Sequence, residues 1–151
     1  MPVNIAELER RARRLLTPEV YDYYAGGSGS ERTLRASVHA WRQHWLMPRV
    51  LRDVSAVDTS LRLPGEPETV AATPVAVAPT GFQGLAHPEG EVATARGAAR
   101  AGALMVLSTR SSMRIEKVAE AVTSEGGAWW FQVYVGCGPS RVTAPKASGT
   151  C

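Results

Sequence analysis

Three short apolar runs alternate with two helix-like segments in the second half of the chain, and this alternation limits the possible folds most strongly. The runs are TPVAVAPT (73–80), ALMVLS (103–108) and AWWFQVYV (128–135). They do not alternate polar with apolar residues, which is typical of strands covered on both faces of a parallel sheet. Residues 87–101 and 112–122 between them predict helices. The resulting order, β-α-β-α-β, is found in doubly wound sheets and in (β/α)₈ barrels.

The length of the chain limits how much of such a fold it can contain. A complete barrel has roughly 250 residues. This chain has 151 residues, and its first strand of this type begins only at position 73. We therefore predict an α/β fold with about three parallel βα units, too few to close a barrel.

Three helices and a ribbon are predicted before these units. Asn4 and Glu7 form a capping-box pattern at the first helix, and Thr17-Pro18 begins a second helix that ends at Gly26. A third helix begins at Ser30, and Pro48 ends its pattern. Residues 57–70 predict a small hairpin. The apolar stripe of the third helix consists of Leu34, Val38, Trp41 and Trp45.

Composition and charge exclude several classes of protein. The chain is 44% hydrophobic and 21% charged, as in soluble globular domains, and its net charge of +3 is too small to indicate nucleic-acid binding. Its two cysteines, Cys137 and Cys151, give neither a disulfide framework nor a metal-ligand spacing. We find no signal peptide or membrane span and expect a cytoplasmic protein.

The candidate ligand site lies where the predicted strands end, because ligands of α/β folds bind at the carboxyl ends of the strands. These positions carry Ala78-Pro79-Thr80-Gly81, Ser108-Thr109-Arg110 and Gln132-Val133-Tyr134. A tight turn with glycine and several neutral polar groups suits a planar heteroaromatic ligand. The alternative is that these polar residues only terminate the strands.

Four segments carry a resemblance to a known family. They are YDYYAGGSGSERT, MPRVLRDVSAVDTS, APTGFQGLAHPEGEVATARGAARAGALMVLST and WWFQVYV, within residues 5–135. Together they resemble the N-terminal part of the FMN-dependent α-hydroxy acid oxidases and dehydrogenases. The resemblance implies an incomplete (β/α)₈ TIM barrel, FMN as cofactor, and oxidation of a small 2-hydroxy acid to a 2-oxo acid. It also implies a parent family that is often homo-oligomeric.

The resemblance also implies roles for individual residues. Tyr134 is implied as a catalytic residue and Tyr23 as a ligand of the substrate carboxylate. The alternatives are that Tyr134 only ends a strand and that Tyr23 packs in an aromatic stripe with Tyr21 and Tyr24. Arg110 stands where several relatives carry an aromatic residue, and it either contacts a carboxylate or points to solvent. The implied flavin contacts are Ala78, Pro79, Thr80, Gly81, Ser108 and Gln132.

Other residues that the family needs are not found in this sequence. They are a histidine general base, an arginine that clamps the substrate carboxylate, and a lysine at flavin N1. We therefore expect a truncated, inactive oxidoreductase from residues 1–135, with an irregular, non-native tail at 136–151. The alternatives are a non-enzymatic remnant, or half of a split barrel that needs a partner chain. A flavodoxin-like domain is disfavoured because FQGLAHPEG is not a phosphate-binding loop.

We also expect apolar surface to stay exposed where further βα units of a complete barrel would cover it. Strands built to be buried on both faces would keep open edges in a chain of this length. We expect uncovered apolar surface at Val75, Val77, Val106, Trp130 and Val133.

Overall fold

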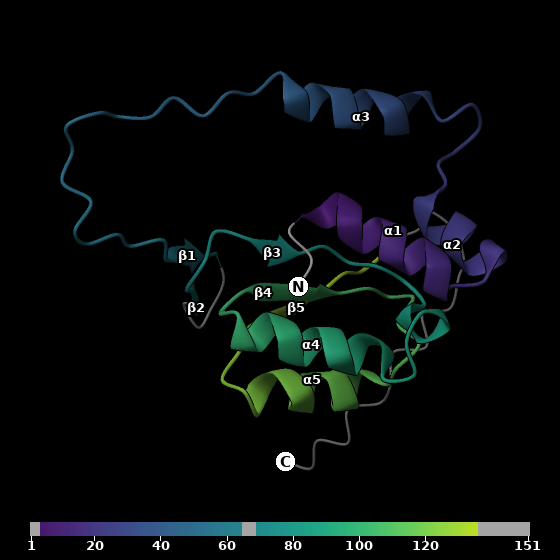
Figure 1. Ribbon diagram of the computed structural model, residues 1–151. Coiled ribbons are helices and arrows are strands. Elements are labelled where there is room, and N and C mark those ends of the chain that lie inside the picture. Colours follow the sequence, from purple (N-terminus) through teal and green to yellow (C-terminus); the bar gives the residue numbers. More distant parts are fainter. Residues whose placement is uncertain (1–3, 65–68, 136–151) are drawn as a thin grey trace, which may run out of the picture.

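The order of elements follows the sequence prediction. The computed structural model describes residues 4–64 and 69–135 (Figure 1). The predicted tail at 136–151, and with it the boundary at residue 135, lies outside the described residues. The elements are α1 (Ile5–Leu15), α2 (Pro18–Ala25), α3 (Arg32–Arg42), β1 (Leu61–Leu63), β2 (Thr69–Ala71), β3 (Ala76–Val77), the 3₁₀ helix η1 (Gln83–Leu85), α4 (Gly90–Arg100), β4 (Leu104–Leu107), α5 (Ile115–Thr123) and β5 (Trp129–Phe131).

Local capping explains where several helices begin and end. The Asn4 side chain accepts a hydrogen bond of 2.9 Å from the Glu7 N–H, which confirms the predicted cap of α1. Pro18 occupies the first turn of α2. Helix α3 begins two residues later than predicted, because Glu31 has a left-handed backbone with φ 56°. Gly102, with φ +66°, follows the end of α4 as predicted.

A three-stranded parallel sheet in the order β3-β4-β5 carries the second half of the chain. Helices α4 and α5 lie side by side along this sheet (Figure 1). Each connects one strand to the next, as a βαβ unit requires. The described residues form no closed barrel, so the observed fold is α/β with an open sheet.

Strand β4 packs on both faces, because successive side chains of a strand point to opposite sides. Met105 and Leu107 are 1% exposed and belong to the core formed with α4 and α5, which includes Val118 and Val122. Leu104 belongs instead to a second cluster. That cluster contains Leu63 and Ala71 of the antiparallel ribbon β1-β2.

The ribbon is fastened to the start of β4 by its backbone. The Ala72 N–H donates to the Gly102 carbonyl at 2.9 Å, and the Thr59 hydroxyl donates to the Ala72 carbonyl at 3.0 Å. A Cβ at Gly102 would lie 2.6 Å from the Cβ of Ala72. Glycine is therefore required at position 102 both for its backbone conformation and for this close approach.

The outer strands leave apolar surface uncovered, largely as expected. Within residues 4–64 and 69–135, strand β3 pairs only with β4, and Val75 beside it is 64% exposed. Trp130 and Val133 are 40% and 60% exposed at the other edge. Val77 and Val106, also on the expected list, are half-buried.

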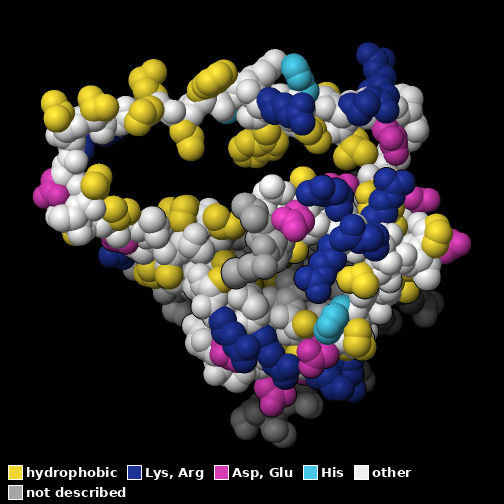
Figure 2. Space-filling view, in the orientation of Figure 1, with side chains coloured by type: hydrophobic (Ala, Val, Ile, Leu, Met, Phe, Trp, Pro, Cys, Tyr) yellow, Lys and Arg dark blue, Asp and Glu magenta, His cyan; other side chains and the backbone are white. Residues whose placement is uncertain are grey.

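Helix α3 and the segment that follows it stand away from the rest of the molecule (Figure 1). Leu34, Val38 and Trp41 of the predicted apolar stripe lie on α3, but the helix ends at Arg42 and does not continue to Pro48, so Trp45 lies outside it. Trp41 and Trp45 are 79% and 89% exposed. Apolar side chains line α3 and residues 43–60 around an open space (Figure 2). No helix within the described residues is both long enough and apolar enough to span a bilayer.

Candidate functional site

The carboxyl ends of the three parallel strands lie at one edge of the sheet, as expected. Residues 78–81 follow β3, residues 108–110 follow β4, and Gln132 follows β5. The Phe82 N–H donates to the Arg110 carbonyl at 2.8 Å, and the Gln132 N–H donates to the Leu107 carbonyl at 2.9 Å. The predicted flavin-contacting segments are therefore neighbours in space.

Gly81 brings two predicted substrate-binding residues next to the turn after β3. A Cβ added at Gly81 would lie 2.9 Å from the Cβ of Arg110 and 3.5 Å from the hydroxyl oxygen of Tyr23. Gly81 therefore lies between a residue of α2 and a residue of the β4–α5 loop. Because glycine has no side chain, Arg110 and Tyr23 can approach the backbone at this position closely.

The three tyrosines of α2 have different surroundings, which bears on the packing alternative for Tyr23. The Tyr21 hydroxyl donates to Glu9 of α1 at 3.1 Å, and the Tyr24 hydroxyl donates to the Phe82 carbonyl at 2.7 Å. Burial, together with the nearby Tyr23 and Glu91, raises the pKa of Tyr24. Tyr23 is 51% exposed, and its hydroxyl has no hydrogen-bond partner among the described residues. Its ring still contacts Tyr24 and Phe82.

Phe82 joins the strand-end segment to α2 and to the β4–α5 loop. Its φ is 57°, a left-handed backbone that costs a non-glycine residue about 1–2 kcal/mol. Hydrogen bonds hold it on both sides, from its N–H to Arg110 and from Tyr24 to its carbonyl. The turn after β3 therefore has a fixed, strained geometry.

Several polar groups at this edge remain available to a ligand. The side chains of Gln132, Tyr134 and Arg110 make no hydrogen bond to another described residue; Gln132 is half-buried and Tyr134 is 63% exposed. Ser108 is 4% exposed, and its hydroxyl oxygen accepts from the Arg110 N–H at 3.1 Å, which leaves its own hydrogen for another acceptor. The Thr109 hydroxyl is buried and has no hydrogen-bond partner in the described part of the chain. Such a group costs about 1–3 kcal/mol.

These groups fit the ring system of FMN. The flavin ring is flat and carries hydrogen-bond donors and acceptors along one edge. The Gln132 amide supplies both a donor and an acceptor, and the Ser108 hydroxyl supplies a donor.

Glu91, which the sequence analysis did not select, connects the two loops behind this edge. It is completely buried. It accepts hydrogen bonds from the N–H groups of Gln83, Ser112 and Met113 and from the Ser112 hydroxyl. Glu91 is the last residue of PEGE at the start of a predicted helix, and this pattern alone does not indicate a buried carboxylate.

A cavity of about 540 Å³ lies beside the site. Of the predicted site residues, only Thr80 lines it, so most of this cavity lies outside the candidate site. The lining residues are Tyr24, Val77, Thr80, Gln83, Ala86, His87, Gly90, Ala93 and Thr94.

Comparison with known sequences gives one family match and close relatives. Residues 12–144 match the family described as FMN-dependent dehydrogenase. The chain is 44% identical over 132 residues to 4-hydroxymandelate oxidase of Amycolatopsis orientalis, which covers 87% of this chain and 35% of the relative. It is 41% identical over 135 residues to L-lactate oxidase of Nostoc, which covers 89% of this chain and 36% of the relative. The chain thus spans about a third of the length of these relatives.

Comparison with solved structures also finds hydroxy acid oxidases that match this chain. The structure matches the crystal structure of mandelate oxidase with a TM-score of 0.80 at 43% identity, covering 89% of this chain and 37% of the other. A second mandelate oxidase structure, a variant with an FMN adduct, matches with a TM-score of 0.76 at 43% identity, covering 85% of this chain and 37% of the other.

Proposed function

Because the chain belongs to the FMN-dependent dehydrogenase family, we propose that it forms the N-terminal part of a (β/α)₈ barrel that oxidises small 2-hydroxy acids. FMN is the cofactor of this family. When bound, it accepts a hydride equivalent from the substrate, which becomes a 2-oxo acid. The chain spans about a third of its relatives, so we propose this activity for the complete barrel and not for residues 1–151 alone.

In this proposal, the residues of this chain bind and orient the flavin ring and the substrate. Ala78, Pro79, Thr80 and Gly81 lie against the flavin ring, and Ser108 and Gln132 hydrogen-bond to its edge. Tyr23 and Tyr134 donate phenol O–H bonds to the substrate carboxylate or hydroxyl. Arg110 adds a positive charge for a carboxylate. Removal of the substrate proton requires a base from the remaining part of the barrel.

One observation carries the proposal: three neighbouring strand ends and α2 place these residues together. Gly81 lies beside both Arg110 and Tyr23, although these two residues are distant in the sequence. The Tyr23 hydroxyl and the Arg110 side chain have no hydrogen-bond partner among the described residues, so both are available to an anion. This arrangement favours a binding role over the alternative in which polar residues only end the strands.

The test is a complemented barrel, a single polypeptide in which residues 1–135 precede the remaining C-terminal part of Amycolatopsis 4-hydroxymandelate oxidase. We expect it to retain FMN after desalting, seen in its visible spectrum, and to oxidise 4-hydroxymandelate. Tyr134→Phe should lower kcat at least about tenfold, equivalent to 1.4 kcal/mol. A folded complemented barrel that retains no FMN would overturn the proposal.

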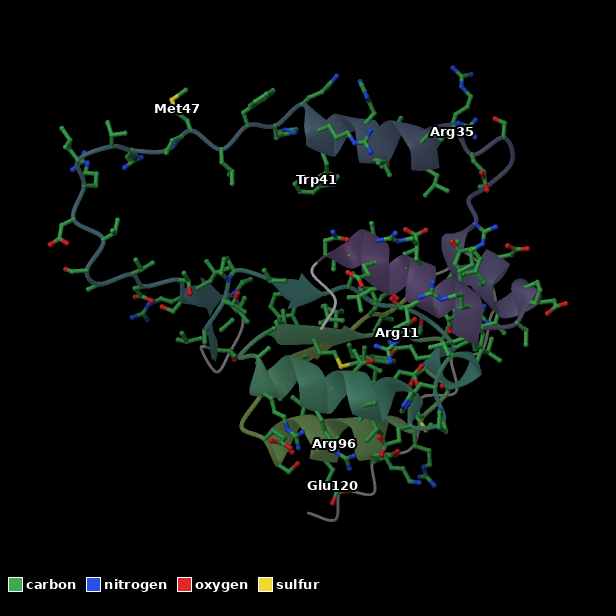
Figure 3. The ribbon with its side chains drawn as sticks, viewed as in Figure 1. Arg11, Arg35, Trp41, Met47, Arg96 and Glu120 are labelled. Atoms are coloured by element: carbon green, nitrogen blue, oxygen red, sulfur yellow. The ribbon has the colours of Figure 1, made fainter. Side chains whose placement is uncertain are left out.

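The split-barrel alternative has one observation in its favour, the exposed apolar side chains of α3 and residues 43–60. Trp41 points from α3 toward the open space, whereas Met47 points away from it (Figure 3). Mixing the 151-residue chain with the same C-terminal part as a separate polypeptide tests this alternative. A stable complex that retains FMN would support it, and no association in sedimentation would contradict it.

A further inference from the structure

Glu91 is a charged side chain that is too deeply buried to contact a substrate. It lies in the first turn of α4, is 0% exposed, and forms no salt bridge with any described residue. Burying an unpaired carboxylate costs several kcal/mol unless hydrogen bonds compensate. Its position therefore requires donors, and the structure supplies four.

Both oxygens of the carboxylate are used. Oε1 accepts from the N–H groups of Gln83 at 3.0 Å and Ser112 at 2.9 Å. Oε2 accepts from the Ser112 hydroxyl at 2.6 Å and the Met113 N–H at 3.2 Å. Burial raises the pKa of Glu91, but the hydrogen bonds from Ser112 and from backbone N–H groups outweigh it, so the pKa lies below its usual value. Glu91 is thus held in its charged form.

The donors come from the two loops that carry the candidate site. Gln83 follows residues 78–81, and Ser112 and Met113 follow residues 108–110. Glycine allows the loops to come close: a Cβ at Gly84 would lie 2.7 Å from the Ser112 hydroxyl oxygen. The Gly84 N–H donates to that same oxygen at 2.8 Å. We call Glu91, Ser112 and their backbone partners the loop clasp.

The loop clasp also explains how the strained turn persists. A left-handed Phe82 needs partners that hold it, and its N–H bond to Arg110 requires the two loops to keep their separation. Glu91 fixes that separation from one side with charge-assisted bonds, which are stronger than neutral ones.

We propose that Glu91 is a positioning residue, which holds the two loops so that Gly81 and Arg110 lie together at the face where the flavin ring binds. The flavin part of this inference rests on the proposed function. Glu91 touches neither cofactor nor substrate and acts through Ser112 and the backbone of both loops.

The first test uses the 151-residue chain, so it does not depend on FMN. In Glu91→Gln, we expect amide hydrogen exchange at Gln83, Ser112 and Met113 to accelerate at least about tenfold. Exchange at Met105 should stay unchanged, because its N–H donates to the Ala128 carbonyl and not to Glu91. Unchanged exchange in the loops, or equal acceleration throughout the chain, would overturn the proposal.

Matched variants separate the loop clasp from a general charge effect. Glu89→Gln removes an exposed carboxylate two residues away, whose bonds within the described part of the chain go to Arg96, and it should leave loop exchange unchanged. Ser112→Ala removes one donor to Glu91, so we expect a smaller effect than that of Glu91→Gln. The double variant should show less than the sum of the two effects, because both remove one network. Additive effects would contradict a shared clasp.

The second test measures the consequence for the cofactor in the complemented barrel. Glu91→Gln should raise the dissociation constant for FMN at least about tenfold and shift the flavin visible spectrum. Glu91→Asp, with a side chain one methylene shorter, should not restore tight binding. If loop exchange changed but FMN affinity did not, the loop clasp would be confirmed as a structural contact, and its proposed role at the flavin face would be overturned. Failure of every complemented barrel to bind FMN would instead contradict the proposed function.

Discussion

Gly81 shows how a single residue sets the geometry of the candidate site. An added methyl group would meet the Cβ of Arg110 at 2.9 Å and the Arg110 carbonyl oxygen at 3.4 Å. Gly81→Ala should therefore destabilise the chain by about 1–3 kcal/mol, as overpacking does. Urea unfolding of the dilute chain, followed by circular dichroism, measures this. An unchanged midpoint would show that the β4–α5 loop yields easily.

Gly97→Ala is the matched control at the same scale. Gly97 lies inside α4, and nothing lies within 4 Å of the place its Cβ would occupy. Since alanine favours a helix interior over glycine, this change should stabilise the chain by about 0.5–1 kcal/mol. Opposite signs for the two glycines would show that contact with Arg110, rather than backbone entropy, decides the effect at Gly81.

Glu91 predicts an acid dependence of stability. Its folded-state pKa lies below the ordinary value of 4.5, so its contribution is complete above pH 4.5 and is lost as pH falls through the lowered pKa. The nearby Tyr24 stays neutral throughout this range. The free energy of unfolding should therefore fall less between pH 6 and pH 3 in Glu91→Gln than in the unchanged chain. Equal losses in urea titrations at both pH values would contradict this.

The layer formed by β4, α4 and α5 allows the stabilisation from a buried apolar side chain to be compared with that from an ion pair. Met105 is 1% exposed in the core, whereas the side chains of the Arg100–Glu125 ion pair, which joins the end of α4 to the turn after α5, are 67% and 29% exposed. Met105→Ala should cost about 2–5 kcal/mol because it leaves a cavity. Glu125→Gln should cost less, and its effect should shrink in high salt. Urea unfolding at two salt concentrations compares them.

The same layer shows what could be predicted from sequence. The runs at 73–80, 103–108 and 128–135 correctly predict strands that alternate with helices along the chain, because short apolar runs between helices have few other solutions. The strands are shorter than the runs, since β3 and β5 each pair on one side only. Glu91 and the left-handed Phe82 were not predictable, because both depend on two distant loops meeting in space. The site roles of Tyr23 and Tyr134 remain predictions from the resemblance.

At the scale of the whole molecule, exposed apolar surface dominates. Trp41, Trp45 and Leu46 are each at least 79% exposed along α3 and the segment after it (Figure 2). We expect the isolated chain to self-associate, because contiguous apolar surface of this kind promotes contacts between copies. Sedimentation velocity over a range of concentrations measures this. The double variant Trp41→Gln, Trp45→Gln should associate less, whereas Arg42→Gln should not change association. A monodisperse monomer would contradict the expectation.

Because β4 packs on both faces, an inserted residue should be tolerated less well within this strand than in a turn. Met105 and Leu107 face the helices while Leu104 faces the ribbon, so one residue added within the strand would exchange these faces. The core would then receive side chains of the wrong size, and the ribbon would lose its partner. An extra residue at Gly126, in the exposed turn before β5, changes no facing pair. Length variation in functional descendants of this sequence should therefore collect in its turns and avoid residues 104–107.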